Sequence, residues 1–334
     1  MLKHQFITEN KGTQKAFLNF LNDWNNPSAF IIQNTSGSTG APKSIKIRKE
    51  KMKASAQMTI DFFSLNERQN ALLCISPAYI GGKMLVVRAI LAKMKLFIAE
   101  TKANPLSDLK INIDFCALTP YQVEHILRET PEQLNLINKL IIGGAPVSSE
   151  MAKELAKFDC EAYSTFGMTE TVSHIALKKL VNNNDAPFNA IGDVHFSTND
   201  NHQLIIHSKK LGITEMTTND VVELLSPTSF HWLGRKDFVV NSGGIKLFPE
   251  KIEEKIRPIL TETLFFLIGV KDSVLGEKLI GFCTRNIENN ELEQIHQKLG
   301  KYEVPKQWIT VKRFELTSSG KIDRLKTKML YYVD

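Results

Sequence analysis

Residues 35–43 read Thr-Ser-Gly-Ser-Thr-Gly-Ala-Pro-Lys and follow a short apolar run, residues 29–32, that predicts a buried strand. Glycines let the backbone turn tightly and bring its N–H groups close to an anion, while hydroxyls and a lysine add donors suited to phosphate oxygens. The strand and loop therefore predict a phosphate-binding segment. Its donors would come from Thr35, Ser36, Gly37, Ser38, Thr39, Gly40 and Lys43. A polar surface turn is the alternative, because these residue types also gather in loops.

This segment differs from a Walker A loop, which needs the pattern G-x-x-x-x-G-K-[ST] at the start of a helix. Here Pro42 precedes the lysine, and residues 44–47 alternate between polar and apolar side chains as a strand does. The loop is therefore expected to lie between two strands.

Composition places the chain among soluble globular proteins of one large or two ordinary domains, with 334 residues, 43% hydrophobic and 23% charged. The net charge of +6, from 42 basic and 36 acidic residues, suits anionic substrates such as nucleotides. No arginine-rich run or known motif supports nucleic-acid binding. No apolar run approaches the ~18 residues of a membrane span, so we expect a cytoplasmic protein without membrane insertion.

The four cysteines, Cys74, Cys116, Cys160 and Cys283, lie far apart in apolar surroundings. They form no C-x-x-C pair, so neither a zinc site nor a redox motif is indicated. We expect four buried, reduced thiols.

The order of predicted elements indicates an α/β fold. Apolar strands at residues 72–75, 95–99, 114–118 and 140–142 alternate with helices, the first of which spans residues 49–63. This repetition predicts a large N-terminal domain with a mostly parallel sheet and ligands at the carboxyl ends of its strands. From about residue 190, short alternating strands predict a small antiparallel β unit. The last ~95 residues predict a small α+β C-terminal domain.

The segment at residues 35–43 resembles the phosphate loop of the adenylate-forming superfamily, which contains acyl-CoA synthetases, adenylation domains and luciferases. Its pattern T-S-G-[ST]-T-G-x-P-K is met at every position. Three further family patterns occur in the family's order: [YF]-G-x-T-E at residues 166–170, a long match from G-R-x-D to P-x-x-[IV]-E at residues 234–253, and G-K-[IV]-x-[RK] at residues 320–324.

The resemblance implies an AMP-forming acyl-CoA synthetase that uses ATP, Mg²⁺ and coenzyme A. A carboxylate would attack the α-phosphate of ATP to give acyl-AMP and pyrophosphate, and coenzyme A would then take the acyl group. Lys321 would bridge the carboxylate and the α-phosphate, Thr169 would donate to that phosphate, and Glu170 would bind Mg²⁺.

The resemblance also implies an adenosine site and a hinge. The adenosine site would consist of Gly143, Gly144, Ala145, Pro146, Thr165, Phe166, Gly167, Asp220 and Arg235. Asn219 replaces the family's glycine before Asp220, so a solvated turn aspartate is the alternative for that residue. Asp237 would be the hinge between domains at residues 1–236 and 237–334, and Gly243 and Gly244 would line the channel for the coenzyme A thiol.

Residues 167–174, Gly-Met-Thr-Glu-Thr-Val-Ser-His, are similar to those of the o-succinylbenzoate–CoA ligases of menaquinone biosynthesis, including their shorter bacterial forms. That substrate is a small aromatic dicarboxylate. Lys83 and Arg88, on a helix that begins at a glycine pair, could hold its second carboxylate. The predicted acyl site comprises Tyr79, Lys83, Arg88, Ser173 and His174. Alternatively, the two cations are ordinary solvated helix residues.

One departure from the family concerns length. Members usually carry well over a hundred residues before the phosphate loop, whereas this chain has 34. We therefore expect a missing or reduced N-terminal subdomain and an acyl pocket that is simpler, or completed by a second copy of the chain in a homodimer. Another aryl- or acyl-CoA ligase, an enzyme that loads a carrier protein, and a non-catalytic nucleotide-binding relic are the competing hypotheses.

Overall fold

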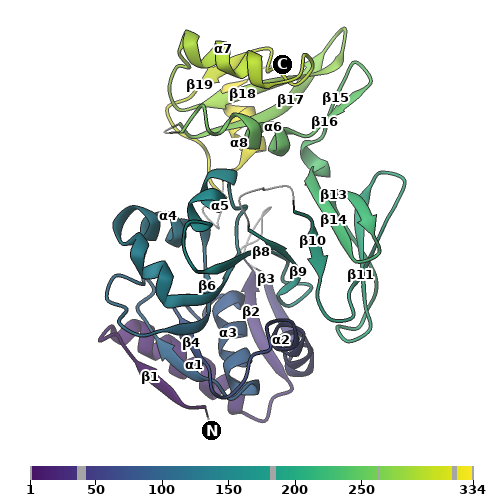
Figure 1. Cartoon of the computed structure of the whole chain (residues 1–334). Coiled ribbons are helices and arrows are strands. Elements are labelled where there is room, and N and C mark those ends of the chain that lie inside the picture. Colours follow the sequence, from purple (N-terminus) through teal and green to yellow (C-terminus); the bar gives the residue numbers. More distant parts are fainter. Residues whose placement is uncertain (1, 36–42, 181–185, 262, 318–321, 333–334) are drawn as a thin grey trace.

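The computed structural model describes residues 2–35, 43–180, 186–261, 263–317 and 322–332 (Figure 1). Its largest element is a 12-stranded sheet. The first six strands of this sheet are mutually parallel and lie in the order β1 (His4–Phe6), β5 (Lys95–Ile98), β4 (Asn70–Leu73), β6 (Ile113–Leu118), β7 (Ile137–Ile142) and β8 (Glu161–Gly167). The mostly parallel α/β sheet predicted from the sequence is thereby confirmed.

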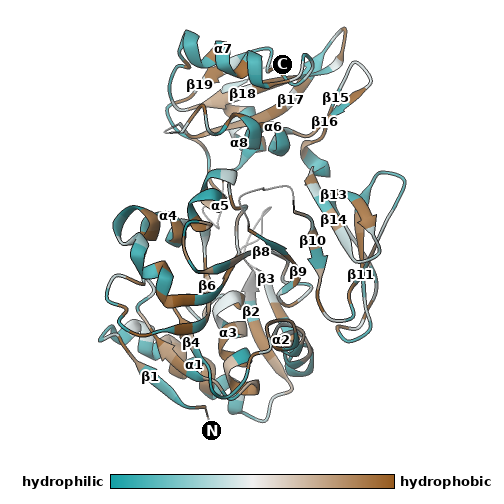
Figure 2. Cartoon of the chain, in the orientation of Figure 1, coloured by the Kyte–Doolittle hydropathy of each residue, from teal (hydrophilic) through white to brown (hydrophobic). Residues whose placement is uncertain are grey.

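Helices cover both faces of the parallel part. They are α1 (Lys11–Asn25), α2 (Lys49–Phe63), α3 (Ile80–Leu91), α4 (Pro120–Glu129) and α5 (Ser149–Leu155), with a 3-10 helix at Pro131–Leu136. Neighbouring residues of one strand enter different cores: Phe115 packs with α1, α2 and α3, and Cys116 packs with α4 and α5. This alternation is what a strand buried on both faces requires, and Figure 2 shows hydrophobic residues along the strands.

The antiparallel strands continue the same sheet beyond β8. They follow in the order β9 (His174–Lys179), β10 (Phe188–Ala190), β14 (Ser229–Arg235), β13 (Ile213–Ser226), β12 (Gln203–Ser208) and β11 (His195–Thr198). The predicted antiparallel β unit exists, but it is joined to the parallel strands because β9 pairs with β8. Residues 161–179, which form this pair, therefore link the two halves of the sheet.

The strand predicted at residues 29–32 lies outside the large sheet. Strand β2 (Phe30–Thr35) pairs with β3 (Lys43–Arg48) in a separate two-stranded antiparallel sheet. Ile31 is buried, whereas Ile32 is 64% exposed. The prediction of a fully buried strand was therefore wrong, because the side chains of a hairpin alternate between its two faces and only one face packs on the core.

The C-terminal residues form a second sheet with cores of their own. Its strands are β15 (Val240–Ser242), β16 (Ile245–Leu247), β17 (Phe265–Asp272), β18 (Gly276–Cys283) and β19 (Trp308–Thr310). The accompanying helices are α6 (Pro249–Ile256), α7 (Asn289–Lys298) and α8 (Arg324–Tyr331), preceded by a 3-10 helix at Lys236–Phe238. In Figure 1 this region sits beyond α5 and the end of β14.

Two smaller observations complete the fold. All four cysteines are free and buried, as predicted, and the Sγ atoms of Cys74 and Cys116 lie 3.8 Å apart on adjacent strands. No helix in the described part of the chain has the length and apolar character needed to cross a bilayer.

Candidate active site

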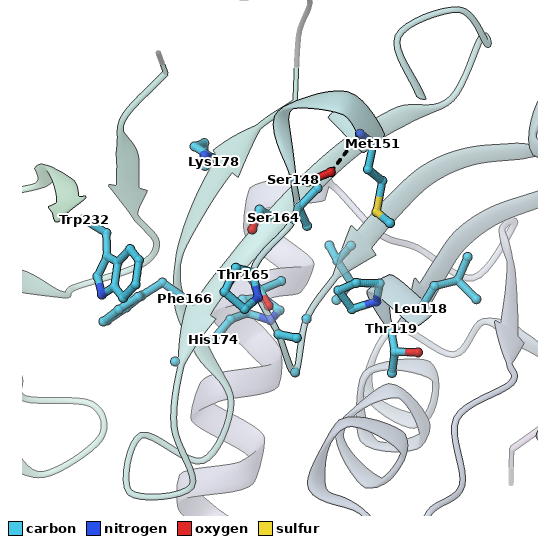
Figure 3. A pocket seen from close by; sticks show the side chains of 18 of the residues that line it. Leu118, Thr119, Ser148, Met151, Ser164, Thr165, Phe166, His174, Lys178 and Trp232 are labelled. Atoms are coloured by element: carbon cyan, nitrogen blue, oxygen red, sulfur yellow. Dashed lines mark hydrogen bonds between the residues drawn. The ribbon is translucent and has the colours of Figure 1, made fainter. Parts of the chain in front are cut away.

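A cavity of about 2200 Å³ lies at the carboxyl ends of the parallel strands. Its lining includes residues that directly follow β6, β7 and β8, as expected for an α/β sheet. The first turn of α3 and residues of α6 and α8 complete the lining. Figure 3 shows Phe166 and Trp232 at one end of the cavity and Leu118 and Thr119 at the other.

Most of the predicted site residues that the structure describes line this one cavity. From the predicted adenosine site these are Gly143, Gly144, Ala145, Pro146, Thr165, Phe166, Gly167 and Asp220. From the predicted catalytic and acyl sites they are Thr169, Glu170, Tyr79, Arg88, Ser173 and His174. Segments more than a hundred residues apart in the sequence therefore meet around one space.

The remaining predicted residues do not contribute to the lining or lie outside the described residues. Lys83, Arg235, Asp237, Gly243 and Gly244 are described but are not among the residues that line the cavity. The predicted donors at residues 36–40 and Lys321 lie outside the described residues, as do the side chains of Thr35 and Lys43.

Two glycines are required where β8 closely approaches neighbouring segments. A Cβ atom on Gly143 would lie 2.4 Å from the Thr165 hydroxyl oxygen, and one on Gly167 would lie 2.3 Å from the Ser173 carbonyl oxygen. A larger residue at position 143 would displace the Thr165 side chain, and one at position 167 would push the backbone at residues 173–174 away. Gly143 and Gly167, which both line the cavity, thus allow the close packing of β8 with its neighbours.

Three side chains form what we call the adenosine cluster: Phe166 on β8, Trp232 on β14 and Asp220 on β13. The Phe166 ring also contacts Phe230, with ring centroids 5.1 Å apart. Asp220 is 7% exposed, and its Oδ1 accepts a hydrogen bond of 2.9 Å from the Trp232 indole N–H. Burial raises the pKa of Asp220, and the hydrogen bond from Trp232 opposes that change. The alternative of a solvated turn aspartate is therefore wrong.

Four side chains form the acyl cluster: Arg88 on α3, Ser173, His174 on β9, and Thr59 on α2. The Arg88 guanidinium is 1% exposed, and its Nη2 donates to Ser173 Oγ over 2.9 Å. Among the described residues, its Nε has no hydrogen-bond partner and no carboxylate forms an ion pair with it. Burial lowers the Arg88 pKa to about 9, which still leaves it charged at neutral pH.

His174 is held neutral within this cluster. Its Nε2 lies 3.0 Å from the Thr59 hydroxyl oxygen, and both side chains are buried. Burial is the main reason that the His174 pKa falls well below its ordinary value, and the nearby Arg88 charge lowers it further. Arg88 is therefore the only charged side chain among these four.

Lys83 was predicted to be part of the acyl site, but in the structure it does not line the cavity. Its ammonium donates to Gln33 Oε1 over 2.8 Å and to the Ala78 carbonyl over 3.1 Å. Lys83 and Arg88 are five residues apart, which places them about 140° apart around a helix axis. They therefore cannot point into the same pocket. Both are buried, so the alternative of solvated helix cations was also wrong.

The C-terminal region supplies a buried ion pair to the cavity lining. Arg324 Nη1 and Nη2 each lie 2.8 Å from a Glu253 oxygen, and Glu253 Oε1 also accepts from the Leu267 N–H over 2.7 Å. Burial raises the pKa of Glu253 to about 7, and the Arg324 charge opposes that rise. The pair fixes the start of α8, the helix that follows the motif containing Lys321.

The surroundings of Glu170 suit a magnesium ion that takes most of its coordinating oxygens from a bound substrate. The Glu170 side chain is exposed in the cavity, and no group of three or more acidic, histidine or cysteine residues that could hold a metal occurs among the described residues. Mg²⁺ is commonly held by one or two carboxylates together with substrate phosphates. A single available carboxylate is therefore sufficient.

Sequence reasoning missed Thr59 and Trp232. Thr59 lies three residues after Ala56 and seven after Met52, so the helical repeat alone places it on the buried face of α2. Trp232 gave no comparable signal, because its contact with Asp220 depends on the pairing of β13 with β14.

Comparisons with known proteins place this geometry in a family. The model of the AMP-binding enzymes matches residues 4–199, which is more than half of the chain. The protein therefore belongs to the family of AMP-binding enzymes, and its predicted membership of the adenylate-forming superfamily is confirmed.

Individual relatives are similar over most of the chain. The 2-succinylbenzoate–CoA ligase of Listeria monocytogenes serovar 1/2a is 25% identical over 92% of this chain and 71% of its own length. An acyl-CoA synthetase (AMP-forming)/AMP-acid ligase II-like protein from Dyadobacter fermentans is 30% identical, with 98% of this chain and 96% of that chain covered and a TM-score of 0.65. The O-succinylbenzoate coenzyme A synthetase of Bacillus subtilis, solved with ATP and magnesium, shares the fold at 17% identity, with a TM-score of 0.75 over 89% and 69% of the two chains.

Proposed function

We propose that this protein is an AMP-forming carboxylate–CoA ligase whose acid is o-succinylbenzoate. The observation that supports this substrate most directly is Arg88, a buried cation at the cavity with an unpartnered Nε and no carboxylate counter-ion among the described residues. The same cavity contains the adenosine cluster together with Thr169 and Glu170.

The electrostatics of Arg88 favour an acid with two carboxylates. Removing an ion from water costs several kcal/mol, and a matching charge with good hydrogen-bond geometry offsets that cost. One carboxylate of the substrate would react with ATP while the other binds Arg88. The apolar side chains of Ile75 and Ile80 also line the cavity and offer contacts for an aromatic ring. Several relatives are named 2-succinylbenzoate–CoA ligases, which agrees with this substrate.

In the first half-reaction, a carboxylate oxygen attacks the α-phosphorus, the bond to the β-phosphate oxygen breaks, and pyrophosphate leaves. Residues 35–43 would hold the β- and γ-phosphates, and Thr169 would donate to the α-phosphate. Mg²⁺ bound by Glu170 would neutralise phosphate charge. Lys321 would bridge the two reacting groups as negative charge develops, which is catalysis by positioning and charge stabilisation.

In the second half-reaction, the thiol of coenzyme A would attack the acyl carbonyl and AMP would leave. Residues 237–334 would move as a mobile domain about Asp237 relative to residues 1–236, bringing Gly243 and Gly244 to the thiol channel. The separate C-terminal sheet and the positive φ angles of these glycines, 59° and 84°, support this assignment. Asp237 Oδ2 accepts from the Asn219 amide over 3.3 Å, so the proposed hinge touches the segment that contains Asp220.

The partners of this reaction are the small-molecule acid, ATP and coenzyme A. We expect the enzyme to work in the cytoplasm, where the two cosubstrates are available, without nucleic-acid or membrane partners. A homodimer that completes the acyl pocket remains a prediction.

Pyrophosphate release, measured over a panel of acids, tests the proposal. We expect o-succinylbenzoate to be preferred at least ~100-fold over benzoate, acetate and fatty acids, since the monocarboxylates leave Arg88 unpaired. Clear preference for a monocarboxylate would contradict the substrate, and no release with any acid would indicate a non-catalytic relic. Comparison of free coenzyme A with a pantetheine-bearing carrier protein then identifies the thiol acceptor.

A further inference from the structure

Lys83 is a buried charged side chain that the proposed mechanism does not use. It lies on α3, is 7% exposed, and no carboxylate of the described residues forms an ion pair with it. Its ammonium instead donates to Gln33 Oε1 over 2.8 Å and to the Ala78 carbonyl over 3.1 Å. The ammonium also lies 6.0 Å from the centre of the Phe20 ring, on α1.

The two partners of Lys83 belong to different parts of the site. Gln33 is a buried residue of β2, the strand that leads directly into residues 36–42. Its Nε2 donates to the Ala78 carbonyl over 3.3 Å, so Lys83, Gln33 and Ala78 are mutually hydrogen-bonded. Ala78 is followed by Tyr79 and Ile80, which line the cavity. The three residues thus link the hairpin to one wall of the cavity.

This link matters because, among the residues that the structure describes, the β2–β3 hairpin has no backbone pairing with the large sheet. Its position relative to the cavity therefore depends on side-chain contacts and on the chain segments at its ends. Strand β3 itself contributes Ile45 to the cavity lining. A small shift of the hairpin would move this wall and the start of the phosphate-binding segment together.

Stability alone is a poor explanation for an ammonium in this place. Burial lowers the pKa of Lys83, which shows that the surroundings disfavour its charge, and Asp23 opposes this effect only from a distance. An apolar side chain of similar length would fill the same space without that electrostatic cost. What such a side chain cannot provide is the two hydrogen bonds by which Lys83 reinforces the direct contact between Gln33 and Ala78.

We propose that Lys83 is a positioning residue that fixes strands β2 and β3, which flank the predicted phosphate-binding segment, relative to the cavity wall at residues 78–81. This proposal rests on the proposed function, because it assigns the effect of Lys83 to nucleotide binding. It acts through Gln33 and does not touch the reacting atoms.

The test compares the variants Lys83→Met and Gln33→Leu, singly and together, with Lys53→Met as a matched control. Lys53 is an exposed residue of the neighbouring helix α2, so its replacement removes one positive charge without touching the link. We expect Lys83→Met to raise the KM for ATP about tenfold, as loss of one charged hydrogen bond would, and to leave the KM for the acid within twofold. Lys53→Met should leave both values unchanged.

A cycle of single and double variants separates positioning from folding. If Lys83 acts through Gln33, the double variant should bind ATP only slightly more weakly than either single variant. The melting temperature of Lys83→Met should stay the same or rise, because a buried charge is removed. A lower melting temperature with an unchanged KM for ATP would overturn the proposal, as would an equal rise in the KM values of both substrates.

Direct titration with ATP keeps this test distinct from a test of the reaction. If the unaltered protein binds ATP but releases no pyrophosphate with any acid, the proposed function fails while the binding difference between wild type and Lys83→Met still decides the role of Lys83. If the unaltered protein does not bind ATP, both proposals are overturned.

Discussion

The acyl cluster and the adenosine cluster line one cavity but differ in burial and charge. Arg88, His174 and Thr59 are each less than 7% exposed, and they come from two helices and a strand that are packed in the core. In the adenosine cluster Asp220 is comparably buried, at 7% exposed, whereas Phe166 and Trp232 are only half-buried and Glu170 nearby is exposed. Selectivity should therefore reside in the acyl cluster, because a buried charge without a partner discriminates strongly between ligands that neutralise it and ligands that do not. The rings of Phe166 and Trp232 offer flat, half-buried surfaces that suit any adenosine ester.

Replacing Arg88 by methionine should produce the largest effect and should fall on the acid alone. Truncating one partner of a buried charge pair costs about 2–5 kcal/mol, so we expect roughly a 1,000-fold loss in kcat/KM for o-succinylbenzoate. The KM for ATP should remain within about threefold of the wild-type value. Steady-state pyrophosphate release at varied acid and varied ATP measures both constants. A comparable rise in the KM for ATP would show that the two clusters are not separate.

Replacing Asp220 by asparagine should have a smaller effect, on the nucleotide alone. Asparagine keeps one acceptor oxygen for the Trp232 indole but loses the negative charge, so we expect the KM for ATP to rise about tenfold. Glu223→Gln, at an exposed position of the same strand, is the control and should change nothing. An altered preference among acids in Asp220→Asn would contradict the division of roles.

The smallest effect concerns pH. Because the His174 pKa lies well below its ordinary value of 6.5, the ring should stay neutral in the folded protein when the pH falls from 8 to 6. The KM for the acid should therefore show no histidine titration in that range.

Folding stability should respond to the same histidine. Below about pH 6.5 the unfolded chain binds a proton at His174 that the folded protein does not, so the free energy of unfolding should decrease as the pH falls. Denaturant unfolding at several pH values measures this slope. His174→Gln lacks the titrating group and should have a shallower slope, and an unchanged slope in that variant would contradict the assignment.

Much of the fold could be predicted because its signals are local. The helix expected at residues 49–63 is α2 with the same boundaries, since its apolar residues recur at helical spacing. Strand β1, with three residues, is too short to show a period, and it exists because the edge of β5 offers backbone partners. The prediction of a buried strand at residues 29–32 was wrong because a short apolar run does not reveal whether both faces of a strand are covered.

The candidate site was likewise predictable only where its residues belong to one local motif. The spacing of Phe166, Thr169 and Glu170 within one motif brings them to one cavity, because they share a strand end and the turn that follows it. The five-residue spacing of Lys83 and Arg88 puts them on different sides of a helix, but it does not say which of the two faces the cavity. Helix α3 is apolar and buried on most of its surface, so its hydrophobic pattern does not indicate which side faces the cavity.

Four short motifs that resemble those of the adenylate-forming superfamily were enough to predict the class of enzyme, because each motif lies within one continuous segment of the sequence. Only the tertiary structure decided which cation of α3 meets the cavity, that Asp220 is paired with Trp232, and that Arg324 neutralises Glu253 from 71 residues away. Each of these depends on how segments that are distant in the sequence pack against one another, and a short sequence motif does not contain that information.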